Sequence, residues 1–399
     1  MKKVFIYILL FYYIVHFIIP GFYFISSGNF NTYTDIDDKE GILKGFILNS
    51  VMVLGTILVI QLLPEKRKSL LIEPKFFSIA PLFYFSIIFS VLYFFLRGGF
   101  EGKLSGSMAG SLFSYLALFL NPYMILLCVL FYQRRQFNLV ILFLIYLVYT
   151  TFTGSRSGFI SLFIIILMYP KFKNYTIYKK SIKKVLFAFL LISPVLFLLA
   201  TVLIREASII FTPDMIMRMI MGRMSFLETS MLPIHYKDLG DPLELFYDKY
   251  GLINQLKIIT DTLFPGSLFG SDVMPNQYYR AAFMGYSEDF VLNVYTSINI
   301  TLPIYLYMYM GGFFSCFFSI LILFFYYCLL RKCINNMFLF VPLLASLYHL
   351  LYFFDWVMWF LQFFTFMLTS FTVYGFVVLR QSFVQMLKKR TEITPNNLL

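Results

Sequence analysis

Long apolar runs alternate with short polar segments along this chain, and that alternation predicts membrane-spanning helices. A bilayer core about 30 Å thick requires roughly 20 apolar residues per helix. About ten runs meet this need, at approximately residues 4–25, 42–63, 76–96, 108–131, 137–153, 157–170, 185–204, 300–330, 337–354 and 357–379. We therefore expect an all-α polytopic integral membrane protein with about ten transmembrane helices.

The Lys and Arg residues between these runs predict how the helices are oriented. The segments 64–75, 132–136, 171–184 and 331–336 and the C-terminal tail are rich in basic residues, whereas the short segments that alternate with them contain few. Because basic loops stay on the inner side, both termini are expected inside. The formal net charge of +12 is then mostly an attraction of the inner face to anionic lipid headgroups. It is no indication of nucleic acid binding.

Composition excludes a soluble fold. Hydrophobic residues make up 60% of the chain and charged residues 13%, and a single soluble core could not bury its 51 Phe and 30 Tyr. The four cysteines have neither the spacing of a disulfide framework nor that of a metal site, so we expect them to be packing residues. They are Cys128, Cys316, Cys328 and Cys333.

One segment is far longer than the other predicted loops and divides the chain into three parts. Residues 1–204 form an N-terminal bundle of about seven spans, residues 205–299 a large external loop, and residues 300–399 a bundle of about three spans with a basic inner tail. The loop is too rich in large apolar residues to be disordered, so we expect it to fold against the outer mouth of the bundle. Helices are predicted after Thr212-Pro213-Asp214 and over roughly 244–263, and Ser225 with Glu228 fits a capping box.

A tight hairpin is predicted at Thr153-Gly154-Ser155-Arg156-Ser157-Gly158, between apolar runs of about 17 and 14 residues. Basic segments on both sides require an even number of crossings between them, which puts Arg156 at the outer tip. Glycines allow a ligand to approach the backbone, and hydroxyl and N–H groups of a turn can bind an anion. The planar guanidinium suits phosphate, although Arg156 could instead reach lipid headgroups or pair with a loop carboxylate.

At this motif the chain resembles the bacterial oligosaccharide repeat-unit polymerases, the Wzy-type or O-antigen polymerases. The resemblance rests on the hairpin Thr153–Phe159, the multispan layout and the large late loop. After that loop, Tyr305-Leu-Tyr-Met-Tyr-Met-Gly311-Gly312-Phe313 is similar to the family's aromatic, glycine-rich entry into a late span.

The resemblance implies a lipid-linked glycosyltransferase of the bacterial cytoplasmic membrane with an outward-facing active site. Such an enzyme transfers a growing glycan from polyprenyl pyrophosphate to the non-reducing end of another lipid-linked repeat unit. The product would be an O antigen, a capsule or an exopolysaccharide. The resemblance implies no metal or other cofactor, lipid-linked oligosaccharides as donor and acceptor, and a chain-length regulator as a candidate partner.

This transfer needs cations that hold the donor pyrophosphate as it leaves. The candidate pyrophosphate-binding residues are Ser155, Arg156, Arg218, Arg223 and Arg280. Arg218 and Arg223 are separated by about 140° around a helix, so they could flank an anion, or each could pair with a nearby carboxylate such as Asp214 or Glu228. Arg205, beside Glu206 at the end of a span, is interpreted as an interface anchor.

The transfer also needs a base for the attacking sugar hydroxyl. The candidate bases are Glu228, His235, Glu288 and Asp289. Glu288 and Asp289 directly precede the eighth predicted span, where they could also form a solvated boundary. Related lipid-linked ligases use a histidine in such a loop, but the residues around His235 match no local motif. His16 and His349 fall within spans and are expected to be packed there.

Two other functions remain open. An O-antigen-type ligase, which moves finished glycan onto a lipid core or a protein, would share the hairpin. A flippase of lipid-linked sugars or another transporter would favour charged residues within the spans and a repeat relating the two halves. This chain keeps its charges at span ends and in the external loop, which favours an enzyme.

Overall fold

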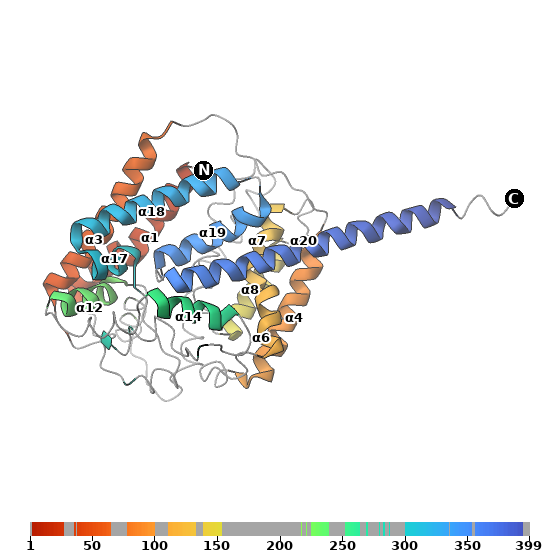
Figure 1. The fold of residues 1–399 in the computed structure, drawn as a ribbon, viewed down its shortest axis with the longest axis horizontal. Coiled ribbons are helices and arrows are strands. Elements are labelled where there is room, and N and C mark those ends of the chain that lie inside the picture. Colours follow the sequence, from red (N-terminus) through yellow and green to blue (C-terminus); the bar gives the residue numbers. More distant parts are fainter. Residues whose placement is uncertain are drawn as a thin grey trace.

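The computed structural model describes residues 2–27, 36, 38–64, 78–99, 111–132, 139–153, 217, 221, 225–238, 252–263, 269, 279, 282–283, 287, 300–334, 336–352 and 356–393. This part of the chain is helical and contains no strand (Figure 1). Five of its helical stretches are long and apolar enough to cross a membrane: Lys2–Ser27, Lys39–Leu62, Leu112–Tyr132, Gly312–Cys333 and Trp356–Met386. The hydrophobic pattern is thus confirmed as that of a helical membrane protein. The count of ten spans and their orientation remain predictions.

The N-terminal half of the described part contains α1 (Lys2–Tyr13), η1 (Ile14–Ile18), α2 (Ile19–Ser27), α3 (Lys39–Leu62), α4 (Ala80–Leu96), α6 (Leu112–Phe119), α7 (Pro122–Tyr132) and α8 (Leu139–Thr153). The later part contains α12 (Leu227–Asp238), α14 (Leu252–Leu263), α17 (Leu302–Met310), α18 (Gly312–Cys333), α19 (Met337–Tyr352) and α20 (Trp356–Ile393). The predicted spans 157–170 and 185–204 lie outside the described residues, as does most of the predicted helix after Pro213.

The first span contains a single π-helical turn, η1, between α1 and α2. Pro20 follows it and has no backbone N–H, so it cannot donate to the carbonyl of His16 four residues earlier. Wider turns of this kind are often found where the regular hydrogen-bond ladder is interrupted. The His16 carbonyl therefore lacks the donor that a regular α-helix would provide at position 20.

Helix α3 packs closely against α18 (Figure 1). A Cβ atom at Gly55 would lie 2.5 Å from Cδ1 of Ile320, so a larger residue at this crossing would require the Ile320 side chain to shift. Small residues at helix crossings let the backbones approach closely, which is how apolar helices associate where burial from water gives no driving force. The two helices run in the same direction, since Leu48 lies next to Cys316 and Gly55 next to Ile320.

The predicted span 300–330 is divided in two, which corrects the single helix expected there. Gly311 has φ of 81°, a left-handed conformation that ends α17 and begins α18. The α17 residues Leu302–Met308 are all buried. Only α18 has the length of a span, whereas α17 is a short helix packed against α18, α12 and α3.

Helices α4 and α8 also run in the same direction. Ser90 pairs with Tyr149, and one turn further on Phe94 and Phe95 pack against Phe152 with ring centroids 5.6 and 5.7 Å apart. Their C-terminal ends therefore lie at the same end of the bundle, as expected if both helices cross from inside to outside. α20, by contrast, packs against α19 along its first part and then extends beyond the other helices (Figure 1).

Candidate functional site on helix α12

Helix α12 comes from the long segment predicted as an external loop, yet residues 225–234 are all buried. The backbone N–H of Phe226 donates to the carbonyl of His16, 3.2 Å away, which is the carbonyl to which Pro20 cannot donate. The rings of Phe226 and His16 are also 4.7 Å apart. The proline-induced turn in the first span thus provides the acceptor on which the start of α12 docks.

Two glycines of α3 accommodate the middle of α12. A Cβ at Gly45 would lie 2.9 Å from the Cβ of Ser230, and a Cβ at Gly41 would lie 3.0 Å from Cγ of Met231. Residues four apart share one face of a helix, so Gly41 and Gly45 form a side-chain-free strip on α3. The loop helix is therefore an integral part of the bundle and not a lid over it.

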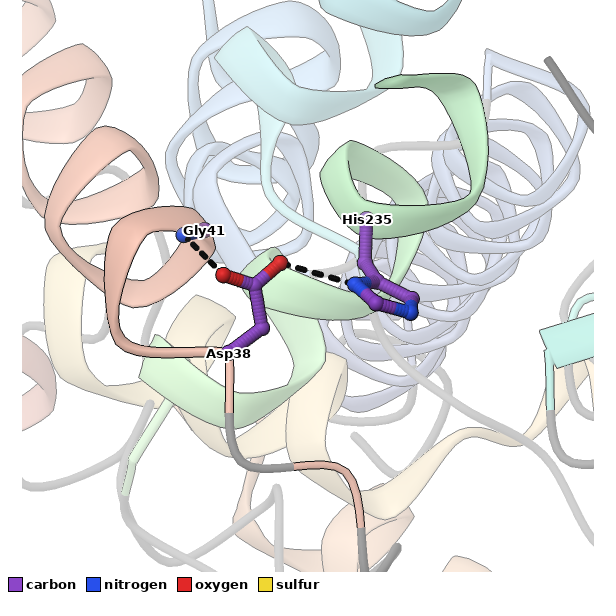
Figure 2. A network of polar contacts seen from close by, with 3 residues as sticks. All are labelled: Asp38, Gly41 and His235. Carbon is purple, nitrogen blue, oxygen red and sulfur yellow. Dashed lines mark hydrogen bonds and ion pairs between the residues drawn. The ribbon is translucent and has the colours of Figure 1, made fainter. Parts of the chain in front are cut away.

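The C-terminal part of α12 is connected to the start of α3 by Asp38 and His235. Asp38 is the N-cap of α3, and its Oδ1 accepts a hydrogen bond of 2.8 Å from the backbone N–H of Gly41. Its Oδ2 lies 2.8 Å from Nδ1 of His235 (Figure 2). One carboxylate thus begins a transmembrane helix and orients a histidine that is 197 residues away in sequence.

The protonation state of Asp38 determines the role of His235. Burial by itself raises the pKa of Asp38, but hydrogen bonds from Gly41 and His235 outweigh burial, and the pKa lies below its ordinary value of 3.8. An ionised carboxylate only accepts hydrogen bonds, so Nδ1 of His235 carries the hydrogen of this pair. In the neutral ring Nε2 then has the lone pair, and it can take a proton from a substrate.

Both side chains of the pair are partly accessible, with 27% of His235 and 21% of Asp38 exposed. Accessibility of this size suits a residue that is held in place yet reaches a substrate. Glu228 differs, because it is only 4% exposed and lies in the first turn of α12. A position seven residues before His235 is about 10 Å away along the helix, so the structure does not bring these two candidate bases together.

Two lysines gather positive charge near the Asp38–His235 pair. The ammonium of Lys237 donates to the carbonyls of Tyr307 and Met308 in the last turn of α17, where a cation is favoured by the helix dipole. Lys237 and Lys44 also lie 4.9 and 5.3 Å from the centroid of the Tyr307 ring. These contacts fix α12 against α17 and place two ammonium groups on the helices that carry the pair.

The sequence analysis missed both Asp38 and Lys44 as functional candidates. The one signal for Asp38 was local, an acid immediately before an apolar helix, and such an acid is typical of a helix cap. Of the predicted site residues, Glu228 and His235 are described. The others, Ser155, Arg156, Arg218, Arg223, Arg280, Glu288 and Asp289, lie outside the described residues.

The chain was compared with protein-family models, with curated protein sequences and with solved structures, and none of them matches it. Its function is therefore inferred from its sequence motifs and from the geometry of the described residues.

Proposed function

We propose that the chain is a glycosyltransferase that joins polyprenyl-pyrophosphate-linked oligosaccharide repeat units into surface polysaccharide at the outer face of the bacterial cytoplasmic membrane. The observation that carries the proposal is the Asp38–His235 pair, a histidine oriented by a carboxylate. His235 lies on α12, a helix of the long segment that the charge pattern predicts to be external. The hairpin motif Thr153–Phe159 and the multispan layout support the same family of reactions.

In the proposed reaction a sugar hydroxyl of the acceptor attacks the anomeric carbon of the donor glycan. Nε2 of His235 accepts the hydroxyl proton while the ionised Asp38 stabilises the imidazolium that forms. The bond between the anomeric carbon and the pyrophosphate oxygen breaks, and polyprenyl pyrophosphate leaves with the bonding electrons. Basic residues favour the approach of this anionic substrate, and Lys44 and Lys237 contribute that charge near the pair.

The size distribution of surface glycan in a bacterial strain that lacks this chain tests the proposal. We expect long chains to disappear while a single repeat unit stays attached to its final acceptor. A plasmid copy of the chain should restore the long chains. An unchanged size distribution in the deletion strain would overturn the proposal and favour transport.

A ligase is the second candidate, because related ligases also use a histidine in an external loop, and His235 is the residue that the structure pairs with a carboxylate. The same deletion strain separates the two functions. A ligase is indicated if full-length chains accumulate on the lipid carrier and fail to reach their final acceptor. A polymerase is indicated if the carrier holds only single repeat units.

A further inference from the structure

Arg97 is the C-cap of α4, and its guanidinium lies among aromatic rings. Its guanidinium carbon is 5.4 Å from the centroid of the Tyr93 ring and 5.7 Å from that of Phe94. The Nε atom is buried and has no hydrogen-bond partner within the part of the chain that the structure describes. The guanidinium is therefore held by aromatic faces while at least one of its donors is unsatisfied.

An unsatisfied buried donor costs free energy, and a partly buried cation costs more. Aromatic rings compensate part of the charge, but they do not replace a hydrogen-bond acceptor. Contact with two rings restricts where the guanidinium lies, and its fork of N–H groups suits a planar or tetrahedral oxyanion. The arrangement is that expected of an arginine whose partner is an anionic ligand.

The end of α8 lies beside this arginine. Phe152 packs on Phe94 and Phe95, and Tyr149 is close enough to Arg97 to interact with its charge. α8 ends at Thr153, the first residue of the hairpin motif. Arg156 is three residues further on, so chain length alone keeps its Cα within about 11 Å of the Thr153 Cα.

The chain also turns sharply just after Arg97. Gly98 and Gly99 have φ of 90° and 66°, and two successive residues in the left-handed region require glycine. These glycines belong to the glycine-rich segment 97–107, whose composition by itself predicts only a flexible linker. The contacts of Arg97 give the start of this segment a specific place at the end of α4 and α8.

We propose that Arg97 binds a phosphate-bearing anion at the shared end of α4 and α8, the end from which the chain continues into the hairpin motif. The anion could be either of two groups. One is the pyrophosphate of the lipid-linked donor, an assignment that rests on the proposed function, and the other is the phosphate headgroup of a membrane lipid. The same side-chain chemistry recognises both, and the experiment separates them.

The test measures binding of farnesyl pyrophosphate to the full-length protein in dodecyl maltoside, a detergent without phosphate, by isothermal titration calorimetry. Arg97→Gln should raise Kd about tenfold or more, the usual effect of losing a charge-assisted hydrogen bond. Arg97→Lys should give an intermediate Kd, because it keeps the charge and loses the fork. The matched control is Arg380→Gln, since Arg380 is another helix arginine, bonded to the carbonyl of Ser78 at 2.7 Å, and its loss should leave Kd unchanged.

The proposal is overturned if Arg97→Gln binds farnesyl pyrophosphate as tightly as the wild type, or if farnesol binds equally well. It is also overturned if Arg380→Gln weakens binding as much as Arg97→Gln, because the effect is then one of overall charge. Size-exclusion profiles and thermal unfolding check that each variant is folded. If Arg97→Gln fails to fold, the Arg97→Lys variant decides, and wild-type affinity in that variant counts against the proposal.

A parallel titration with dioctanoyl phosphatidylglycerol identifies the source of the anion. Tighter Arg97-dependent binding of farnesyl pyrophosphate indicates the substrate, and tighter Arg97-dependent binding of phosphatidylglycerol indicates a lipid headgroup. The proposed function is tested separately by the glycan of the deletion strain. Unchanged glycan together with Arg97-dependent anion binding would reject the glycosyltransferase and keep the anion site.

Discussion

The segment predicted as a large external loop contains two described helices, α12 and α14, that differ in how they are buried. α12 is buried from all sides over residues 225–234. α14 buries one stripe, formed by Gln255, Ile258 and Ile259, while Ile253 and Leu256 remain 71% and 49% exposed. The sequence of α14 has its apolar residues on one face of the helix. The sequence of α12 has no distinct apolar face.

This difference in burial indicates which of the two helices belongs to the candidate functional site. α12 docks on η1, on the glycine strip of α3 and on the end of α17 (Figure 1), and its His235 is paired across the chain. α14 contacts α20, where Trp356 donates a hydrogen bond to Gln255. Changes in α12 should therefore affect activity and folding together, and changes in α14 should affect mainly local stability.

The largest effect is expected from His235→Ala. Removal of a proton acceptor slows the transfer by about 10²–10⁴-fold, so long surface glycan should be absent from a strain that expresses this variant. The measurement is glycan length by gel electrophoresis at matched protein levels. Thr260→Ala in α14 is the control and should give wild-type chain lengths. Long chains from His235→Ala would remove this residue from the mechanism.

Asp38→Asn should have the next largest effect. Asparagine caps a helix as well as aspartate does, so α3 should keep its start. It carries no charge and can donate as well as accept, so the orientation of His235 is no longer fixed, and misplaced catalytic groups cost about 10²-fold in rate. We expect shorter or fewer chains from a protein that still folds and whose unfolding temperature is lowered only by the lost charge of Asp38. Normal chain lengths would show that the carboxylate only caps α3.

Gly45→Ala tests the docking of α12 on α3. The new Cβ would lie 2.9 Å from the Cβ of Ser230, and overpacking of this kind costs about 1–3 kcal/mol. The unfolding temperature in detergent should fall, and transfer should fall with it. Gly375→Ala is the control, because no atom lies within 4 Å of its added Cβ. Equal stability of the two variants would contradict the close approach of α12.

Acid should weaken the contact between Asp38 and His235. The pKa of Asp38 is lower in the folded protein than its ordinary value of 3.8, so its contribution to stability is fully present above pH 3.8. It is lost as the pH falls through the lowered folded value. The unfolding temperatures of the wild type and Asp38→Asn should therefore differ by a constant amount from pH 7 to pH 5 and converge below pH 3.8. A difference that persists at pH 2 would mean that the charge of Asp38 contributes nothing.

Gln255→Ala in α14 should have the smallest effect. It removes the acceptor of the Trp356 N–H, and loss of one such hydrogen bond costs about 1 kcal/mol. Surface glycan should keep its wild-type length. A loss of polymer as severe as that of His235→Ala would show that α14, too, belongs to the active site, and the distinction between the two helices would fail.

The hydrophobic pattern of single segments determined many of the helices of this protein. The apolar runs predicted the helices that end near Leu62, Leu96 and Thr153, since the length and apolarity needed to cross a bilayer are properties of a single segment. The same patterns missed the break at Gly311, because an aromatic, glycine-containing run is apolar on both sides of the turn. Hydropathy records how apolar a segment is, and it does not record its backbone conformation.

The pairing of the candidate site was decided only by the tertiary structure. Sequence reasoning favoured Glu228 over His235, around which it found no local motif, whereas burial favours His235, because Glu228 is in the core and His235 is partly exposed. Asp38 lies beside His235 because α12 docks on the first span and on α3. The start of α12 donates a hydrogen bond to the His16 carbonyl, and Gly41 and Gly45 leave room for α12 on α3. Those contacts join positions about 200 residues apart, and the chain's local pattern determines the helices on which they lie but not which faces meet.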